Sequence, residues 1–316
     1  MRRFGATRLA NWLGSCHINM PFPLMGINAA GLAVAMNNAD AYDGWNNCGL
    51  NTSMIARIIL ENCANVDEAA ELLEKIRLAG AYYHKKTGSM FFLADRQKAY
   101  LSEFCALASQ FAVMEFGYVI RANSWRLPGV TALSKHGSKH LANDAFREYQ
   151  VRDVLNEAMR HGGVRVEDCF AASRLRGGDV KAGVFPVCWE SSTAFATCQP
   201  DAEFPELSTF YLASGPPRNS VVIAVSFAAQ ALPLEMYTGN WTAKAQRFKA
   251  EAGMDHNKMP EIERLEQELL QEYRLVRERA RVLLRENNPG QAQKIMRENL
   301  AGQLAKAEKF FDGLLP

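Results

Sequence analysis

The sequence predicts a mixed α+β protein in which strands and helices occur in separate runs. Three observations lead to this prediction: a pair of short alternating strands near the N-terminus, a run of strand-like segments after residue 88, and long amphipathic segments after residue 242. Of the 316 residues, 48% are hydrophobic and 22% are charged, which is enough apolar material for a large core. Two antiparallel sheets covered by helices are the packing that this order of elements favours.

The first predicted elements are two short strands joined by a tight turn within residues 22–39. Apolar and small residues alternate in these strands, and the sequence Asn-Ala-Ala-Gly at residues 28–31 supplies the turn. A helix is predicted over residues 50–62, because its apolar residues recur at helical spacing. Asn65 and Glu68 have the spacing of a capping box, so we expect a second helix to begin there.

Strand signals dominate the next part of the chain. Four segments rich in aromatic and β-branched residues are separated by polar turns, and each has the length of one strand. They are Ser89–Asp95, Ala99–Cys105, Gln110–Gly117 and Tyr118–Trp125. The residues that follow predict helices over 144–160 and 166–175, and further strands over 192–198, 209–213 and 221–227.

The composition changes near residue 242. Between Glu261 and Glu286, charged residues of both signs surround an apolar stripe, which predicts a long amphipathic helix, and residues 291–311 predict another. We therefore divide the chain into a mixed α+β domain at residues 1–241 and a helical extension at residues 242–316. Because the extension carries so much apolar surface, we expect it to dock within the subunit or to mediate a homo-oligomer.

Composition and motif searches exclude several classes of function. The 36 Lys and Arg against 34 Asp and Glu give a net charge of +2, so no nucleic-acid partner is expected. No apolar run is long enough to span a membrane and no signal peptide is visible, which predicts a cytoplasmic protein with no membrane partner. The seven cysteines and six histidines show no metal-ligand spacing, and no phosphate-binding glycine motif occurs. We expect no metal and no cofactor.

Asparagines at predicted strand ends are the remaining candidates for chemistry. Asn37 and Asn38 follow one predicted strand, and Asn123 lies near the end of another. A neutral amide can donate to a developing oxyanion without needing a particular protonation state, although such asparagines also serve as ordinary turn residues. Trp125 and Tyr42 are plausible walls of a pocket, or simply core aromatics.

The order of these motifs resembles a known family. Residues 26–38, GINAAGLAVAMNN, follow the pattern Gly-Φ-Asn-x-x-Gly-Φ-x-Φ-x-Φ-Asn, in which Φ is apolar. Residues 121–125, RANSW, resemble a Thr-Asn-Ser/His element, and DAFREY places Arg147 at a helix start. From about Pro21 to Pro217, this succession resembles the N-terminal-nucleophile hydrolases related to acyl-coenzyme A:isopenicillin N acyltransferase. Penicillin V acylase and choloylglycine hydrolase are neighbouring families.

This resemblance implies a four-layer αββα sandwich with a C-terminal helical tail. It implies attack on a linear amide by an N-terminal cysteine whose own α-amine, with a pKa near ~8, serves as the base. The substrate would be a small-molecule amide or acyl compound such as a penicillin, a bile salt or an N-acyl amino acid. Asn38 or Asn37, together with Asn123, would bind the oxyanion and position the substrate. Arg147 would steady the nucleophile and tune its pKa.

The chain departs from the family pattern at the nucleophile. The family places its cysteine several tens of residues before the glycine motif, whereas only 25 residues precede Gly26 here. Cys16 is the one upstream thiol. Two alternatives stay open: an amidohydrolase or acyltransferase that is N-terminally incomplete or uses Cys16 after processing, and a non-catalytic relative that serves as a binding or structural protein. We expect the asparagines and Arg147 to converge on one pocket, and the chain as written to be inert toward amides.

Overall fold

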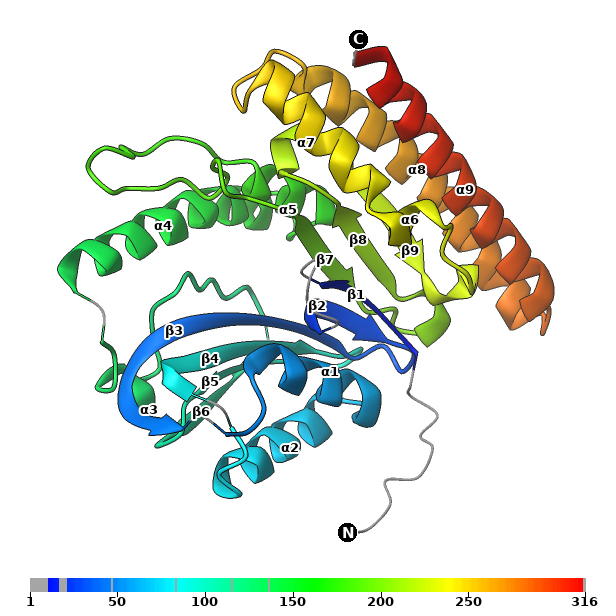
Figure 1. The fold of residues 1–316 in the computed structure, drawn as a ribbon. Coiled ribbons are helices and arrows are strands. Elements are labelled where there is room, and N and C mark those ends of the chain that lie inside the picture. Colours follow the sequence, from blue (N-terminus) through cyan, green and yellow to red (C-terminus); the bar gives the residue numbers. More distant parts are fainter. Residues whose placement is uncertain are drawn as a thin grey trace.

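The computed structural model of the protein describes residues 11–16, 22–46, 48–82, 84–114, 116–135 and 137–314. Their strands form two antiparallel sheets, one in the order β1-β2-β3-β4-β5-β6 and one in the order β7-β8-β9 (Figure 1). Strands adjacent in each sheet are also adjacent in sequence, so both sheets are meanders. The strands are β1 (Trp12–Cys16), β2 (Pro23–Asn28), β3 (Ala33–Asn46), β4 (His84–Ala94), β5 (Ala99–Phe104), β6 (Ser109–Met114), β7 (Phe195–Gln199), β8 (Thr209–Ala213) and β9 (Ile223–Ser226).

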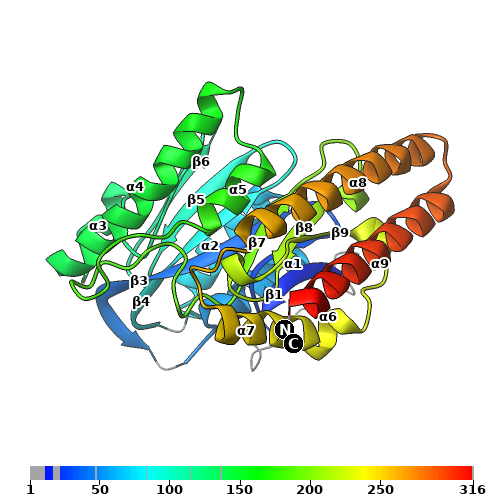
Figure 2. The ribbon, with the colours of Figure 1, turned by 90° about the horizontal axis from the view of Figure 1, so that it is seen from above.

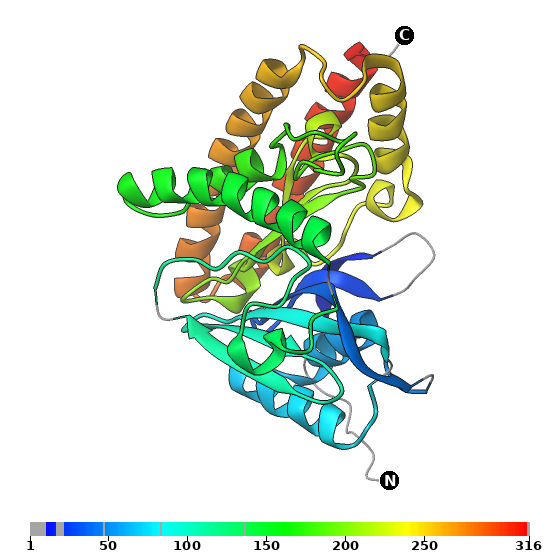
Figure 3. The same ribbon diagram turned by 90° about the vertical axis from the view of Figure 1, so that its left-hand side faces the viewer.

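Helices lie outside both sheets. α1 and α2 cover one face of the six-stranded sheet, and α8 and α9 run side by side over the three-stranded sheet, as the view from above shows (Figure 2). Figure 3 shows α4 between the six-stranded sheet and the C-terminal helices. The helices are α1 (Thr52–Asn62), α2 (Val66–Leu78), α3 (Pro128–Thr131), α4 (Ser138–Arg160), α5 (Val166–Ser173), α6 (Glu235–Thr238), α7 (Asn240–Ala252), α8 (Met259–Arg285) and α9 (Pro289–Leu314).

Separate hydrophobic cores join these layers. Under α1 and α2, buried Leu73 and Phe91 belong to one core. Between the two sheets, Ile27 of β2 and Phe210 of β8 belong to a second core. The outer helices complete further cores on the three-stranded sheet, one of which contains the fully buried Phe311. The predicted mixed α+β fold with the layer order αββα is therefore confirmed.

The C-terminal helices pack on β8 and β9 of the same chain. Tyr273 of α8 is buried and its hydroxyl lies 2.6 Å from Thr209 Oγ1 of β8. Gln303 of α9 is 2% exposed and forms two hydrogen bonds with the backbone of Ala224 in β9. Its Oε1 accepts from the amide N at 3.0 Å, and its Nε2 donates to the carbonyl at 3.1 Å. The side-chain amide of Gln303 thus binds the N–H and C=O of Ala224. β9 is an edge strand of the three-stranded sheet and would otherwise present these two groups to another strand.

The turn between β2 and β3 depends on a buried asparagine. Asn28 is fully buried, and its Oδ1 accepts from the amides of Ala30 and Leu32, both at 3.0 Å. Its Nδ2 donates to the carbonyls of Leu60 at 3.0 Å and Cys63 at 2.7 Å, at the end of α1. This residue therefore fixes the hairpin and attaches it to α1. An asparagine oxygen also accepts from the backbone at the predicted start of α2, where the Asn65 side chain accepts from the amide of the residue three positions on.

The expected strand over residues 118–125 is wrong. The structure has no strand or helix among residues 116–127, although the segment is rich in strand-forming residues. Its amides do not face a neighbouring strand, because buried carboxylates accept them instead: Glu148 accepts from Ala122, Asp144 from Asn123, and Glu103 from Arg126. Hydrogen bonds to side chains that are distant in sequence thus take the place of the backbone hydrogen bonds to a neighbouring strand that the local pattern predicted.

Three other elements differ from the sequence-based expectation. α4 begins at Ser138 and not at residue 144, so Arg147 lies inside the helix and not at its start. β1 was not predicted, yet it pairs with β2 from Trp12↔Asn28 to Cys16↔Pro23. β3 does not end at Asn37 and Asn38 but continues to Asn46, so both asparagines lie within the strand. In the part of the chain that the structure describes, every helix is too short or too polar to cross a membrane.

Candidate functional site

Polar side chains from three distant parts of the chain meet on the inner face of the six-stranded sheet, which is the face turned away from α1 and α2. Asn123 Nδ2 donates to Asn37 Oδ1 of β3 at 2.7 Å, across 86 residues of sequence. Arg147 of α4 donates from Nη2 to Asn123 Oδ1 at 3.0 Å. Asn37 Nδ2 donates to the carbonyl of Ala122 at 2.5 Å. The structure thus brings together Asn37, Asn123 and Arg147, which we call the amide–guanidinium cluster.

Asn38 does not share this face with Asn37. Neighbouring side chains of a strand point to opposite sides of the sheet. Asn38 pairs with Ser89 of β4, and its Oδ1 accepts from Thr52 Oγ1 of α1 at 3.1 Å, on the helix-covered outer face. Only its backbone reaches the cluster, because the Asn38 carbonyl accepts from Asn123 Nδ2 at 2.9 Å. Of the two adjacent candidates, Asn37 is therefore the one whose side chain lies in the cluster.

The amide of Asn123 is already fully used as a donor. A side-chain amide has two N–H bonds, and those of Asn123 go to Asn37 Oδ1 and to the carbonyl of Asn38. Its oxygen accepts from Arg147. A substrate carbonyl that binds Asn123 must therefore replace one of these two acceptors.

Three buried carboxylates hold the segment of residues 121–127 that carries Asn123. Asp144 and Glu148, one turn apart on α4, accept from the amides of Asn123 and Ala122 at 3.2 and 3.1 Å. Glu103 of β5 is fully buried and accepts from Arg121 Nε at 2.7 Å and from the amide of Leu127 at 2.8 Å. Hydrogen bonds to these carboxylates thus fix the conformation of the segment, which has no neighbouring strand to pair with.

The aromatic residues expected to line a pocket have other surroundings. Trp125 is 2% exposed, belongs to a small core with Met90 and Val130, and donates from Nε1 to the carbonyl of Asp40 at 2.9 Å. A Cβ at Gly88 would stand 2.5 Å from the Trp125 ring, so the glycine makes room for the indole. Trp125 is therefore a core residue. The side chain of Tyr42 lies outside the described residues.

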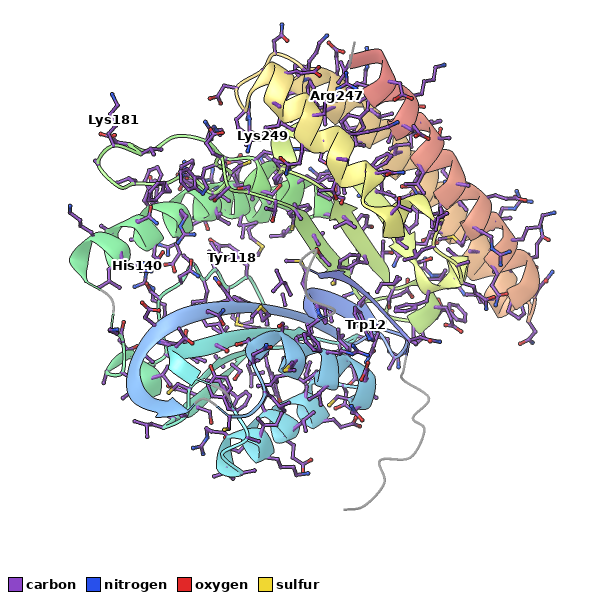
Figure 4. All side chains as sticks on the ribbon, viewed as in Figure 1. Trp12, Tyr118, His140, Lys181, Arg247 and Lys249 are labelled. Atoms are coloured by element: carbon purple, nitrogen blue, oxygen red, sulfur yellow. The ribbon has the colours of Figure 1, made fainter. Side chains whose placement is uncertain are left out.

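The space beside the cluster is bordered by α4 and its contacts. Figure 4 shows Tyr118 between α4 and the six-stranded sheet, and His140 near the start of α4. The Tyr118 hydroxyl donates to Asn156 of α4, and His140 Nε2 lies 3.2 Å from Asp144 Oδ2. The larger described cavities lie elsewhere, for example one of about 440 Å³ between α7 and α9. No residue of the amide–guanidinium cluster lines these described cavities. The asparagine and arginine side chains therefore meet at a junction of polar groups and not in one of these cavities.

Several thiols are poorly suited to nucleophilic attack. Burial raises the pKa of the Cys63 and Cys198 thiols to about 12, and burial also raises the pKa of Cys169 and Cys188. Because the thiolate is the reactive form, these four residues are mostly unreactive near neutral pH. The side chain of Cys16 lies outside the described residues, but its backbone ends β1.

The backbone register places Cys16 at the same end of the sheet as the cluster. Cys16 pairs with Pro23 of β2, and two residues further along β2, Met25 pairs with Ala35 of β3. The pairing of β2 with β3 ends at Met25↔Ala35, and β3 continues from there to Asn37. Cys16 and Asn37 therefore both lie beyond this last pair, toward the same end of the sheet.

Metal chemistry has no basis in the described side chains. Among the described residues, no group of three or more His, Cys, Asp and Glu side chains is arranged to hold a metal ion. The charged groups nearest the cluster are instead paired as acid and base, with Arg147 against Asp144 and Arg126 against Glu148. The site can therefore offer hydrogen-bond donors and one guanidinium to a bound molecule.

The αββα arrangement places the protein in the class of four-layer sandwiches, in which two antiparallel sheets lie between helices. A family model described as "AAT: Acyl-coenzyme A:6-aminopenicillanic acid acyl-transferase" matches residues 15–195, more than half of the chain. The chain belongs to this family. The matched range includes Cys16 and every residue of the cluster.

Solved structures give a more distant likeness. The chain is similar to a mutant of conjugated bile acid hydrolase from Clostridium perfringens, at 13% identity and a TM-score of 0.41, covering 67% of this chain and 75% of that chain. A second variant of conjugated bile acid hydrolase from Clostridium perfringens gives 13% identity and a TM-score of 0.40, over 68% and 75% of the two chains. A comparison with curated proteins gives no match.

Sequence reasoning missed the three carboxylates that support the site. Glu103, Asp144 and Glu148 do not differ from other acidic residues in any motif, and the sequence does not show which acids become buried. One usable signal was present: Asp144 and Glu148 are four residues apart on a predicted helix, with Arg147 between them. That spacing places both acids on one side of the helix.

Proposed function

We propose that this protein is an amidohydrolase or acyltransferase of the N-terminal-nucleophile type that acts on a linear amide C–N bond of a small molecule. The observation that carries the proposal is the direct contact of Asn37, Asn123 and Arg147, which come from three separate elements within the matched family range. A stability role alone does not require two amides and a guanidinium at one junction.

The cluster suits the chemistry of acyl transfer. When a nucleophile attacks an amide carbonyl, the carbonyl oxygen becomes an oxyanion that preorganised N–H donors stabilise. Asn37 and Asn123 supply such donors, and Arg147 supplies a positive charge beside them. The nucleophile forms a bond to the carbonyl carbon, the C–N bond breaks and the amine leaves with a proton. Water or a second amine then removes the acyl group.

Cys16 is the candidate nucleophile in this proposal. Its backbone ends β1 on the side of the sheet toward which β3 continues to Asn37, which supports this choice. Making Cys16 an N-terminal residue, with a free α-amine to act as the base, would remove residues 12–15, which supply four of the five residues of β1 and pair with β2. Attack by Cys16 through its own α-amine therefore has a structural cost, which is the loss of most of β1.

The test is an amide-cleavage assay of the full chain and of a processed form with penicillin V, glycocholate and an N-acyl amino acid amide. The chain as written is expected to be inert, whereas a form processed to begin at Cys16 should turn over at least one of them, with turnover reduced about 100-fold or more by Asn123→Ala or Arg147→Ala and abolished by Cys16→Ala. Arg160→Ala, an exposed arginine on the same helix, is the matched control and should leave turnover unchanged. Turnover that survives the first two substitutions would contradict the proposed site, and turnover that survives Cys16→Ala would contradict only the nucleophile.

A second function, binding without catalysis, is favoured by one observation. Both amide hydrogens of Asn123 are already bonded within the protein, as in a junction built for rigidity. In this case the same three compounds would raise the melting temperature of the chain without being cleaved. An Arg147→Ala variant would lose that shift. Absence of both turnover and binding would contradict both functions.

A further inference from the structure

Asp144 makes more contacts with the cluster than any other described acid. It is fully buried, near the start of α4, and its two oxygens have different partners. Oδ2 accepts from the amide of Asn123 at 3.2 Å and from Ser124 Oγ. Oδ1 accepts from Arg147 Nη2. One carboxylate therefore holds both the backbone of Asn123 and the guanidinium of Arg147.

These contacts close into a ring. Arg147 Nη2 donates to Asp144 Oδ1 and also to Asn123 Oδ1, while the Asn123 amide returns to Asp144 Oδ2. The side-chain amide of Asn123 is thereby turned so that its Nδ2 reaches Asn37. The hydrogen bond from Arg147 to Oδ1 helps to orient the Asn123 side-chain amide. Asp144 in turn holds the guanidinium of Arg147 in place.

Glu148 offers an internal comparison. It lies one turn further along α4, is 6% exposed, and holds the same segment through the amide of Ala122 at 3.1 Å and through Arg126 at 2.9 Å. Within the described part of the chain, its hydrogen bonds go to neither the side chain of Asn123 nor that of Arg147. The two acids are therefore alike in burial, in helix and in the loop that they support, and they differ in whether they hold the cluster.

We infer that Asp144 is a positioning residue of the site, which fixes the orientation of Asn123 and Arg147 relative to each other. The expected effect on kcat rests on the proposed function, whereas the expected effect on the Asn123–Arg147 contact rests on the geometry alone. An asparagine at position 144 keeps a single oxygen, which cannot accept both from Arg147 and from the Asn123 amide with Ser124. The guanidinium therefore moves away, and the Asn123 side-chain amide is held only by its two Nδ2 hydrogen bonds. Glu148 lacks this role, because its contacts end at the backbone and at Arg126.

The experiment compares Asp144→Asn with Glu148→Gln, each by crystal structure of the full chain and by steady-state kinetics of the processed form on the best substrate of the panel. For Asp144→Asn we expect the 121–127 backbone to stay in place while the Asn123–Arg147 contact of 3.0 Å is lost. We also expect kcat to fall about 100-fold with little change in KM, since misplaced groups slow the chemical step. Glu148→Gln should retain the contact, and its kcat should fall much less than that of Asp144→Asn, while Glu157→Gln, at an exposed acid of the same helix, should leave kcat unchanged.

The outcomes separate this inference from the proposed function. An Asn123–Arg147 contact that persists in Asp144→Asn overturns the inference, even if the unaltered chain has no turnover. A kcat that falls equally in both variants also overturns it, since that result indicates general loosening of the segment. If Asp144→Asn fails to fold, Ser124→Ala removes one donor from the same carboxylate and should lower kcat in the same direction. No fall in kcat with Ser124→Ala would then count against the role.

Discussion

The two faces of the six-stranded sheet are built on different principles, although the same strands supply both. On the outer face, Val34, Phe91 and Leu93 pack under α1 and α2 in a core of apolar side chains. On the inner face, Asn37 and Glu103 hydrogen-bond to segments up to 86 residues away. The outer face is stabilised by burial, which has no preferred direction, and the inner face by hydrogen bonds, which require particular partners.

This difference explains how one sheet serves both stability and a site. Apolar packing tolerates small shifts of its members, whereas each buried polar group needs a partner at the right distance and angle. The inner face therefore fixes the positions of its side chains more strictly than the outer face does. Four substitutions test the contrast, beginning with the one of largest expected effect.

Phe91→Ala should produce the largest loss of stability. Phe91 is fully buried on the outer face, and replacing such a phenylalanine leaves a cavity, so the free energy of unfolding should fall by about 3–5 kcal/mol in urea titrations. Its neighbour Phe92 points to the inner face and is only partly buried, which makes Phe92→Ala the matched control. Equal losses for the two variants would contradict the distinction between the faces.

Glu103→Gln should have the next largest effect. The fully buried carboxylate holds Arg121, which is 12% exposed, and the amides of Arg126 and Leu127. Losing the charge leaves the arginine without its counter-ion, which should cost about 3 kcal/mol. Hydrogen exchange should increase most in residues 121–127. If exchange increases instead across β5 and its neighbouring strands, the carboxylate supports the sheet and not the segment.

Thr52→Val tests the polar end of the outer face. Thr52 Oγ1 lies 2.5 Å from Ser89 Oγ and donates to Asn38 Oδ1, so removing the hydroxyl should cost about 1 kcal/mol. Ser102→Ala is the control, because the buried Ser102 hydroxyl has no hydrogen-bond partner among the described residues, and its removal should leave thermal stability unchanged or slightly higher. A larger loss for Ser102→Ala than for Thr52→Val would reverse this expectation.

The smallest expected effect is a change in acid stability. Hydrogen bonds from Arg77 and Ser109 lower the pKa of Glu74 from 4.5 to about 2. A depressed pKa adds stability that is fully present above the unfolded-state value and is lost as the pH falls through the folded-state value. The stability difference between the unaltered chain and Glu74→Gln should therefore shrink between pH 4.5 and about 2. A difference that stays constant over this range would contradict the expectation.

Local patterns were sufficient to predict much of the fold. The turn at residues 28–31, the cap at Asn65 and the amphipathic stripes of α8 and α9 each depend on residues close in sequence, and each is present in the structure. The family motifs also led us to expect Asn123 and Arg147 to meet, and they are hydrogen-bonded. Their catalytic roles remain part of the proposal.

What the sequence did not predict depends on long-range polar contacts. Residues 118–125 have the composition of a strand, but Glu148 and Asp144 accept from the amides of Ala122 and Asn123, and Glu103 accepts from the amide of Arg126 just beyond. Likewise, the choice between Asn37 and Asn38 was open until the register with β4 placed them on opposite faces. Nothing in the local sequence specifies which distant acid approaches a given amide, so propensity alone gives the wrong answer there.

The pairing of Gln303 with Ala224 has a consequence for the order of events during synthesis. The amide that occupies the edge of β9 is encoded 79 residues after the strand it protects. At roughly 5–20 residues per second on the ribosome, the finished strand waits about 4–16 s before its partner has even been made. During that interval, the N–H and C=O of Ala224 lack the partner that they have in the finished chain.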